Sequence, residues 1–120
     1  MNAPFTQSDA PFGHEHGPML TGPFAPVLKE TVLTDLPVQG EIPRDLNGVY
    51  LRNGPNPRFK PKGAYHPFDG DGMMHSVRVK DGAVSYRNRF VRTKGFDAEQ
   101  EAGRSLWAGL AEHPSRSTRP

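Results

Sequence analysis

Histidines and alternating aspartates are the residues of this chain whose types could support chemistry. The chain contains five histidines, His14, His16, His66, His75 and His113. An imidazole nitrogen is a common metal ligand, and two histidines at i and i+2 could chelate a metal on a strand. Residues 14–16 have this spacing, but their Pro-rich surroundings offer no preorganised site. The sequence therefore favours a solvated segment there, and it shows no firm ligand spacing among residues 27–120.

Asp69 and Asp71 alternate with glycines, a pattern that could offer oxygen ligands to Ca²⁺. An EF-hand loop needs a glutamate at its twelfth position, which counted from Asp69 is Lys80. The calcium interpretation fails on that position. We expect instead a glycine turn, through Gly70 and Gly72, whose aspartates accept hydrogen bonds from nearby backbone N–H groups.

The clearest structural signal is a β-hairpin around Asp81-Gly82, a dipeptide that favours a two-residue hairpin turn. Such a turn fixes the register, so Lys80 should face Ala83 and every earlier residue should pair in step. One face then carries Met73, His75, Val77, Val79, Val84, Tyr86, Asn88 and Phe90. The other carries Ser76, Arg78, Lys80, Ser85, Arg87 and Arg89. We expect the first face to be core and the second to be solvated.

His75 lies on the apolar face of this hairpin, opposite Asn88. A buried histidine needs a hydrogen-bond partner, and the Asn88 amide could supply one. A metal-binding role is the alternative, but a lone histidine on a core face is more often structural. We therefore predict a His75–Asn88 hydrogen bond.

The remaining elements follow from local composition. Residues 27–39 favour a strand, and residues 48–52 predict a short strand that ends at Asn53-Gly54-Pro55. Residues 97–111 are predicted to be helical, with Asp97 as the N-cap. Residues 1–26 are rich in Pro and Gly and are predicted to be an extended or disordered arm.

Bulk composition limits the size of the core. Hydrophobic residues make up 34% of the 120 residues, whereas Gly and Pro number 13 each. The hairpin's apolar face needs another sheet to cover it, and nothing in the chain clearly supplies one. We therefore expect an all-β fold that is the beginning of something larger.

Charge, cysteine content and hydropathy narrow the function classes. The net charge of +2 gives weak grounds for a nucleic-acid partner, and the absence of cysteine excludes disulfides and thiolate sites. No apolar run approaches 18 residues, and no secretory signal is visible. We expect a cytoplasmic protein.

Basic and aromatic residues alternate along 86–96, as in proteins that bind single-stranded nucleic acid. In the hairpin register, however, Arg87 and Arg89 point away from Tyr86 and Phe90. A solvated basic face is the better interpretation, so no nucleic-acid partner is predicted. A small non-enzymatic binding module that uses this basic face remains the alternative function.

Several motifs together resemble the carotenoid cleavage oxygenases, a family that includes lignostilbene dioxygenases and retinal-pigment-epithelium isomerases. They are Gly40-Glu41-Ile42-Pro43, Leu46-Asn47-Gly48, Tyr50, Arg52-Asn53-Gly54-Pro55-Asn56-Pro57 and Phe68-Asp69-Gly70-Asp71-Gly72-Met73. The resemblance runs from about Gly40 to about Thr93. It implies that residues 27–120 are the incomplete N-terminal part of a seven-bladed β-propeller, preceded by the arm at 1–26 and carrying one short helix near the C-terminus.

The resemblance also implies a reaction. Family members cleave an alkene C=C bond with O₂, using non-haem Fe(II) held by four histidines, three of which are oriented by glutamates. None of this chain's histidines matches a ligand position, so no catalytic, cofactor-binding or metal-ligating residue is assigned here, and the chain alone is expected to be inactive. The resemblance assigns one substrate-binding residue, Phe68, which would line a tunnel for a hydrophobic conjugated substrate. It leaves peripheral membrane contact and oligomeric state open.

Two branches of the family compete for the substrate. Residues 102–107 resemble a stretch of the lignostilbene branch, which places a phenol-binding tyrosine a few residues further on. The corresponding position is Gly109 or Leu110 here, which argues against a 4-hydroxystilbene. The motifs at 52–57 and 66–73 look more like those of the carotenoid and apocarotenoid branch.

Overall fold

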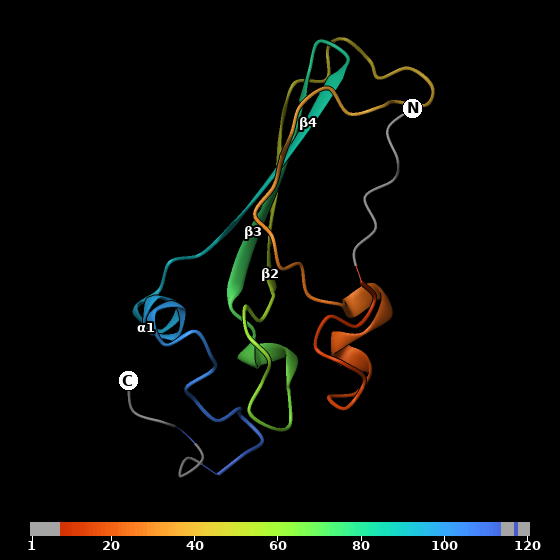
Figure 1. The fold of residues 1–120 in the computed structure, drawn as a ribbon. Coiled ribbons are helices and arrows are strands. Elements are labelled where there is room, and N and C mark those ends of the chain that lie inside the picture. The colour runs from red at the N-terminus through yellow and green to blue at the C-terminus, as the bar shows by residue number, and fades with distance from the viewer. Residues whose placement is uncertain (1–7, 114–116, 118–120) are drawn as a thin grey trace.

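The computed structural model describes residues 8–113 and 117, and they form a four-stranded antiparallel sheet with one α-helix (Figure 1). The strands are β1 (Val32–Leu33), β2 (Gly48–Pro55), β3 (Gly72–Lys80) and β4 (Ala83–Phe90), in the spatial order β1-β4-β3-β2. The helices are α1 (Lys94–Ala102) and three 3₁₀ turns, η1 (Pro18–Leu20), η2 (Gly22–Phe24) and η3 (Pro67–Asp69). The predicted all-β class with one helix is confirmed. The propeller stays a prediction, because one sheet does not show it.

The β3–β4 hairpin has the predicted register. Lys80 pairs with Ala83, Val79 with Val84 and Met73 with Phe90. The turn residues Asp81 and Gly82 have φ angles of 50° and 75°. Positive φ at both central residues matches the right-handed twist of the flanking strands, so the turn sequence sets the register.

The predicted faces of this hairpin are also largely confirmed. Met73, Asn88 and Phe90 are buried on the apolar face, while Arg78, Lys80, Arg87 and Arg89 are exposed on the other. The other residues of the two faces are half-buried: His75, Val77, Val79, Val84 and Tyr86 on the apolar face, and Ser76 and Ser85 on the other. The core therefore lies at the end of the hairpin far from its turn.

Two predicted strand boundaries are wrong. The strand expected over 27–39 is reduced to Val32–Leu33, and Asp35 shortly after it has φ 51°, which ends the extended backbone. β2 runs on to Pro55 rather than stopping at Asn53. Pro55 pairs with Gly72 at the sheet edge, where a missing N–H on the outer side costs no ladder bond.

The predicted helix at 97–111 is displaced towards the N-terminus. Its N-cap is Thr93, whose hydroxyl accepts a hydrogen bond from the Phe96 N–H at 3.0 Å. Asp97 lies in the first turn instead, and Gly103 ends the helix with φ 70°. Phe96 stacks on Phe90 with ring centroids 5.0 Å apart and closes the small core around Met73.

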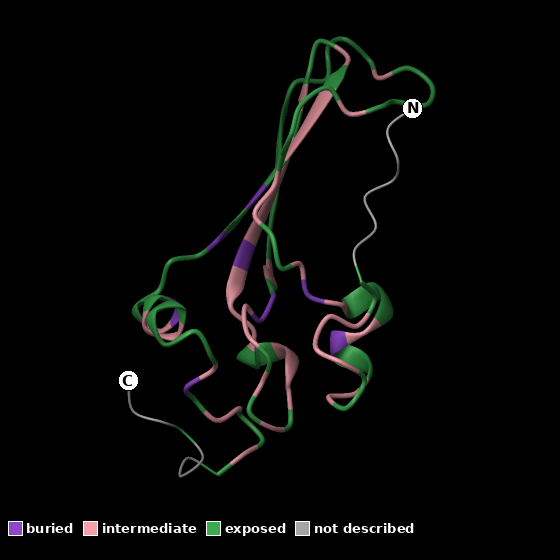
Figure 2. Ribbon diagram, in the orientation of Figure 1, coloured by how far each residue is buried: buried purple, intermediate pink, exposed green. Residues whose placement is uncertain are grey.

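The molecule is elongated. Its radius of gyration is 17.1 Å and its extents are 55 × 28 × 22 Å. A compact domain of this length would have a radius of gyration of about 14 Å. Figure 2 shows buried residues in short, separate patches, in the lower part of the sheet, in α1, in the N-terminal turns and in the loops. No helix within residues 8–113 is long and apolar enough to cross a membrane.

Candidate functional site

Phe68 lies in the middle of η3 and its ring is 84% exposed. The turn is held by reciprocal caps: His66 Nδ1 accepts from the Phe68 N–H at 3.1 Å, and the Asp69 carboxylate accepts from the His66 N–H at 2.9 Å. The His66 ring also contacts the Phe68 ring edge-on at 4.7 Å. The backbone that carries this exposed aromatic ring is therefore fixed, and the ring is free to stack on another molecule.

Glycines bring the turn after Phe68 against β2. A Cβ at Gly70 would lie 2.8 Å from the backbone nitrogen of Asn56, and one at Gly72 would lie 3.0 Å from Val91. Neither glycine has a positive φ, so close approach, and not turn conformation, requires them. A shallow hollow of about 490 Å³ results, lined by Asn53, Gly54, Pro55, Pro67, Phe68, Gly70 and Gly72.

Asn56 joins this region to the N-terminal arm. Its side chain accepts from the Val27 N–H at 2.6 Å and donates to the Val27 carbonyl at 2.7 Å, while Asn56 itself is 6% exposed. Its own N–H donates to the Asp71 carbonyl at 2.7 Å. Sequence reasoning missed this role, although an asparagine between two prolines was a visible signal.

The predicted His75–Asn88 hydrogen bond is wrong. The two residues are paired in the register, but His75 Nδ1 lies 2.6 Å from the Tyr86 hydroxyl. The Asn88 side chain accepts from the Thr31 N–H at 2.6 Å instead. Burial, and then the charge of Arg52, lower the pKa of His75, so its neutral form is favoured.

The segment 14–16 is only partly solvated. His14 is exposed as expected, but the His16 side chain is 8% exposed, and its Nδ1 lies 3.0 Å from the Gly63 carbonyl. Glu15 beside it forms an ion pair with Lys60. The expectation of a solvated segment is therefore wrong for His16, which ties the arm to the loop before η3. Residues 1–7 of the predicted arm lie outside the described part.

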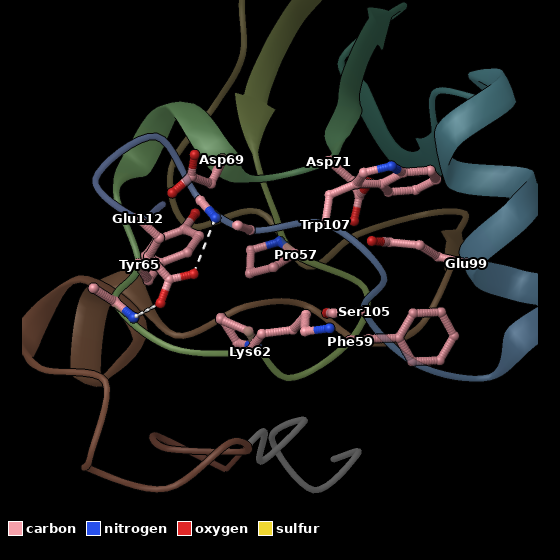
Figure 3. A pocket seen from close by; sticks show the side chains of 14 residues that line it. Pro57, Phe59, Lys62, Tyr65, Asp69, Asp71, Glu99, Ser105, Trp107 and Glu112 are labelled. Carbon is pink, nitrogen blue, oxygen red and sulfur yellow. Dashed lines mark hydrogen bonds between the residues drawn. The ribbon is translucent and has the colours of Figure 1, made fainter. Parts of the chain in front are cut away.

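A second cavity of about 110 Å³ lies between the loops at 57–71 and 105–112 and helix α1 (Figure 3). Four carboxylates line it, those of Asp69, Asp71, Glu99 and Glu112. Figure 3 shows Asp71 and Glu99 beside Trp107 on one side, with Tyr65, Asp69 and Glu112 on the other. Sequence reasoning missed this cavity, because its walls come from three separate segments.

Each of these carboxylates accepts a backbone hydrogen bond that joins two segments. Asp69 accepts from the Leu110 N–H at 2.7 Å, and Asp71 from the Arg58 N–H at 2.9 Å. The predicted role as acceptors of local backbone N–H groups is confirmed for Asp69, which also accepts from the His66 N–H, whereas the bond of Asp71 reaches a segment 13 residues away. Two further bonds, from Leu106 N–H to Glu99 at 3.0 Å and from Ala64 N–H to Glu112 at 2.9 Å, complete the set.

The cavity perturbs its own titratable groups. Burial raises the pKa of Asp71 and of Glu99, and the charge of Asp71 adds to the effect on Glu99. Burial, with the charges of Asp69 and Asp71, raises the pKa of Tyr65 to about 12. The cavity is therefore a place where extra negative charge is unfavourable.

The described residues do not fit an iron site. Among residues 8–113 and 117, no three His, Cys, Asp or Glu side chains are grouped so that they could hold a metal ion. In three histidines the Nδ1 atom already takes part in a hydrogen bond within the chain. Its partner is the Gly63 carbonyl for His16, the Phe68 N–H for His66 and the Tyr86 hydroxyl for His75. No step of a metal-dependent reaction is derived from this chain.

The basic face of the hairpin is partly neutralised. Glu30 accepts from Arg89 at 2.8 Å and from Arg92 at 2.9 Å. Its other contact is with the Phe90 N–H at 3.3 Å, so Glu30 fixes the segment before β1 on the end of β4. Arg78, Lys80 and Arg87 are left as the exposed cations of this face.

Comparisons with known sequences identify the family. The profile of the retinal pigment epithelial membrane protein family matches residues 24–119. Carotenoid 9,10(9',10')-cleavage dioxygenase 1 of Phaseolus vulgaris is 51% identical over 93 residues, which are 78% of this chain and 17% of that protein. A carotenoid cleavage oxygenase of Mycobacterium tuberculosis is 55% identical over 78 residues, which are 63% of this chain and 16% of that protein.

Solved structures show the same relationship. Lignostilbene dioxygenase of Pseudomonas brassicacearum superposes with a TM-score of 0.75 at 27% identity, over 98% of this chain and 24% of that one. A variant of Synechocystis apocarotenoid oxygenase gives 0.66 at 36% identity, over 74% of this chain and 19% of that one. The chain thus spans less than a quarter of each of these relatives. It belongs to the retinal pigment epithelial membrane protein family, which is the family of the carotenoid cleavage oxygenases.

Proposed function

We propose that this chain is part of a non-haem Fe(II) dioxygenase that cleaves a C=C bond of a carotenoid, apocarotenoid or stilbene-like substrate with O₂. The identity of 51% to a carotenoid cleavage dioxygenase supports the reaction class. The iron, which would activate O₂, would be held by histidines outside this chain. The 120 residues alone are proposed to be inactive.

Phe68 is the residue of this chain that we assign to the substrate. The observation that carries the assignment is an 84% exposed ring on a backbone fixed at both ends by His66 and Asp69. A rigid aromatic ring can stack on a flat conjugated chain without losing much side-chain freedom. The hollow beside it, walled by Pro55 and Pro67, offers apolar contact to the same molecule.

A carotenoid or apocarotenoid is favoured over a stilbene. Among the superposed structures, the apocarotenoid oxygenase variant is 36% identical over 74% of this chain and the lignostilbene dioxygenase 27% identical over 98% of it. The residues proposed for the phenol-binding position, Gly109 and Leu110, cannot donate a side-chain hydrogen bond to a phenol. We further propose a cytoplasmic protein that touches a membrane surface peripherally, where such substrates dissolve.

The proposal is tested first by reading the coding DNA beyond the codon for Pro120. We use "the encoded protein" for the product of the whole reading frame. An open frame of several hundred codons with four well-spaced histidines is expected, and purified encoded protein should bind Fe(II) and consume O₂ with a carotenoid. A stop codon directly after Pro120, with a stable product of that length in cells, would remove the enzyme from consideration.

Phe68→Ala then tests the residue assignment in the encoded protein. Loss of one aromatic stacking contact should raise KM about fivefold, since such contacts contribute on the order of 1 kcal/mol. Leu46→Ala is the matched control, because Leu46 is also exposed but lies in the loop before β2. Equal KM values for the two variants would contradict the assignment of Phe68.

The second candidate is a small binding module that uses the basic face of the hairpin, with its four exposed cations Arg78, Lys80, Arg87 and Arg89. Affinity for single-stranded nucleic acid that falls steeply with salt, and is lost on Arg87→Glu with Arg89→Glu, would support it. The Glu30 ion pair with Arg89 counts against it, because one of the four cations is already neutralised.

A further inference from the structure

The turn that carries Phe68 begins with a histidine, and one hydrogen bond fixes the tautomer of that histidine. The Phe68 N–H donates to His66 Nδ1 at 3.1 Å. A backbone N–H can only donate, so Nδ1 must offer a lone pair, and the proton of the neutral ring must be on Nε2. The place of the proton on His66 therefore follows from the geometry of the turn.

The Phe68 N–H depends on this one acceptor. Pro67 comes first in η3 and has no N–H, so the Phe68 N–H is the first free donor of the turn. The next N–H, that of Asp69, donates to the His66 carbonyl at 2.8 Å. Without the His66 nitrogen, the residue that carries the exposed ring would lose its own backbone hydrogen bond.

The His66 ring also supports the Phe68 side chain. The two ring centroids are 4.7 Å apart, and the ring planes are inclined at 72°. His66 thus contacts both the backbone and the side chain of Phe68. Because the Phe68 ring is 84% exposed, a movement of His66 would be passed on to it directly.

Protonation removes the acceptor. An imidazolium carries a hydrogen on both nitrogens, so Nδ1 would present a donor to the Phe68 N–H. The Asp69 carboxylate keeps its bond to the His66 N–H at 2.9 Å, so the turn would be loosened and not lost. Histidine is the side chain that ordinarily changes its charge between about pH 5 and pH 8, a range in which enzymes are assayed.

The ionisable groups around the turn come from three places. Tyr65 precedes the turn, Asp69 lies in it, and Glu112 reaches it from the C-terminal loop through the Ala64 N–H at 2.9 Å (Figure 3). The carboxylates of Asp69 and Glu112 each accept from two backbone N–H groups. Burial, helped by neighbouring aspartates, raises the pKa of Tyr65 to about 12, so its hydroxyl stays neutral at neutral pH. His66 is therefore the group of this turn that we expect to change with pH.

We propose that His66 is a positioning residue for Phe68: its neutral ring holds the backbone that presents the Phe68 ring to the substrate, and protonation releases that backbone. The inference deepens the proposed function, because it rests on the assignment of Phe68 to the substrate. Since the effect passes through Phe68, it should change KM more than kcat. We expect about a threefold rise in KM, below the rise for Phe68→Ala, because only one of the two caps is lost.

Two amide variants separate the acceptor from the charge. The side-chain oxygen of asparagine is bonded to Cγ, as Nδ1 of histidine is, so His66→Asn keeps an acceptor in place at every pH of the assay. His66→Gln carries the same amide one methylene further out, where it cannot reach the Phe68 N–H in the same way. It is the matched control.

KM and kcat of the encoded protein are measured with a carotenoid at about pH 8 and at about pH 5.5. At the higher pH, His66→Asn should rescue the KM of the unmodified protein, and His66→Gln should have a KM about threefold higher. At the lower pH, the unmodified protein should match His66→Gln, and both should exceed His66→Asn about threefold. His75, at the groove that Pro67 lines, is present in all three proteins, so comparison at one pH removes its contribution.

Hydrogen exchange at the Phe68 amide reports on the cap without substrate. It is measured in the encoded protein by mass spectrometry with fragmentation to single residues, again comparing proteins at one pH. Exchange should be faster in His66→Gln than in the other two at the higher pH, and slowest in His66→Asn at the lower pH. Exchange in His66→Gln as slow as in the unmodified protein at the higher pH would overturn the proposal, as would identical exchange in His66→Asn and the unmodified protein at the lower pH.

Phe68→Ala keeps two possible failures apart. In that background His66→Gln should raise KM no further, because the effect passes through the missing ring. A further rise would overturn positioning through Phe68. If Phe68→Ala leaves KM unchanged while exchange follows the expected pattern, the assignment of Phe68 to the substrate is wrong, and the positioning role falls with it although the cap is real.

Discussion

At the scale of single residues, Asn56 shows how one side chain joins two segments far apart in the sequence. Its amide satisfies both backbone groups of Val27, at 2.6 and 2.7 Å, in a position that is 6% exposed. A carboxamide carries an acceptor oxygen and a donor nitrogen side by side, so it can bond both backbone groups of one residue. The arm from Val27 towards the N-terminus therefore depends on it.

Asn56→Ala should destabilise the encoded protein by about 2–4 kcal/mol, since two hydrogen bonds are lost and buried backbone groups are left unsatisfied. Equilibrium unfolding in urea measures the loss, and the Val27 amide should exchange with solvent much faster. Asn47→Ala is the control, because Asn47 makes weaker bonds of 3.2 and 3.4 Å at an exposed site. An unchanged exchange rate at Val27 would contradict this role of Asn56.

Glu99 gives a pH prediction with a definite sign. Burial, helped by the charge of Asp71, raises its folded pKa above the ordinary 4.5. The protonated form is then favoured by folding, so this contribution to stability is present below about pH 4.5 and is lost as the pH rises through the raised value. Stability attributable to Glu99 should therefore decrease from acid towards neutral pH.

Glu99→Gln should remove that decrease. The glutamine oxygen still accepts from the Leu106 N–H, so we expect a gain on the order of 0.5 kcal/mol at pH 7, small because the group is half-exposed and screened. Urea titrations at pH 4 and pH 7 measure it, and Glu101→Gln on the exposed side of α1 is the control. A variant less stable than the unmodified protein at pH 7 would reverse the sign and refute the argument.

At the scale of elements, the features that could be predicted from the sequence are those that depend on neighbouring residues, such as the turn of a hairpin. The Asp81-Gly82 turn set the register of β3 and β4, because a two-residue turn leaves no freedom to slip. The helix was misplaced because Asp97 and Thr93 are both acceptable caps, and only the contact of Phe96 with Phe90 selects Thr93. The partner of His75 and the cavity at Glu99 could not be predicted, since both depend on side chains brought together by tertiary packing.

Gly70 tests how tightly the η3 turn is pressed against β2. Gly70→Ala would place a methyl 2.8 Å from the Asn56 nitrogen and from Pro55 Cβ, so the encoded protein should lose about 1–3 kcal/mol of stability. Gly48→Ala is the matched control: Gly48 begins β2 and a Cβ there meets nothing within 4 Å. Chemical denaturation measures the free energy of unfolding of both variants. Equal values would show that the turn can move away from β2.

At the scale of the whole molecule, the elongated shape and the poor burial have one cause. Apart from two buried prolines, Pro26 and Pro57, five apolar residues are buried in the described chain: Leu20, Met73, Phe90, Phe96 and Leu106. Burying a large apolar side chain contributes about 1.5–3 kcal/mol, whereas ordering each residue costs roughly 1–2 kcal/mol of backbone entropy. So small a core cannot hold together a molecule that extends over 55 Å, and we expect the missing burial to come from elsewhere in the encoded protein.

The 120-residue chain on its own should therefore not unfold cooperatively. Circular dichroism should show a shallow, nearly linear loss of strand signal on heating, and amide resonances should be poorly dispersed, because most side chains along β2 have nothing to pack against. The encoded protein, in which we expect the sheet to be covered, should melt in a sharp transition under the same buffer. A sharp transition with well-dispersed amides from the short chain would contradict this prediction, because the sheet would then be stable with its apolar edge open to water.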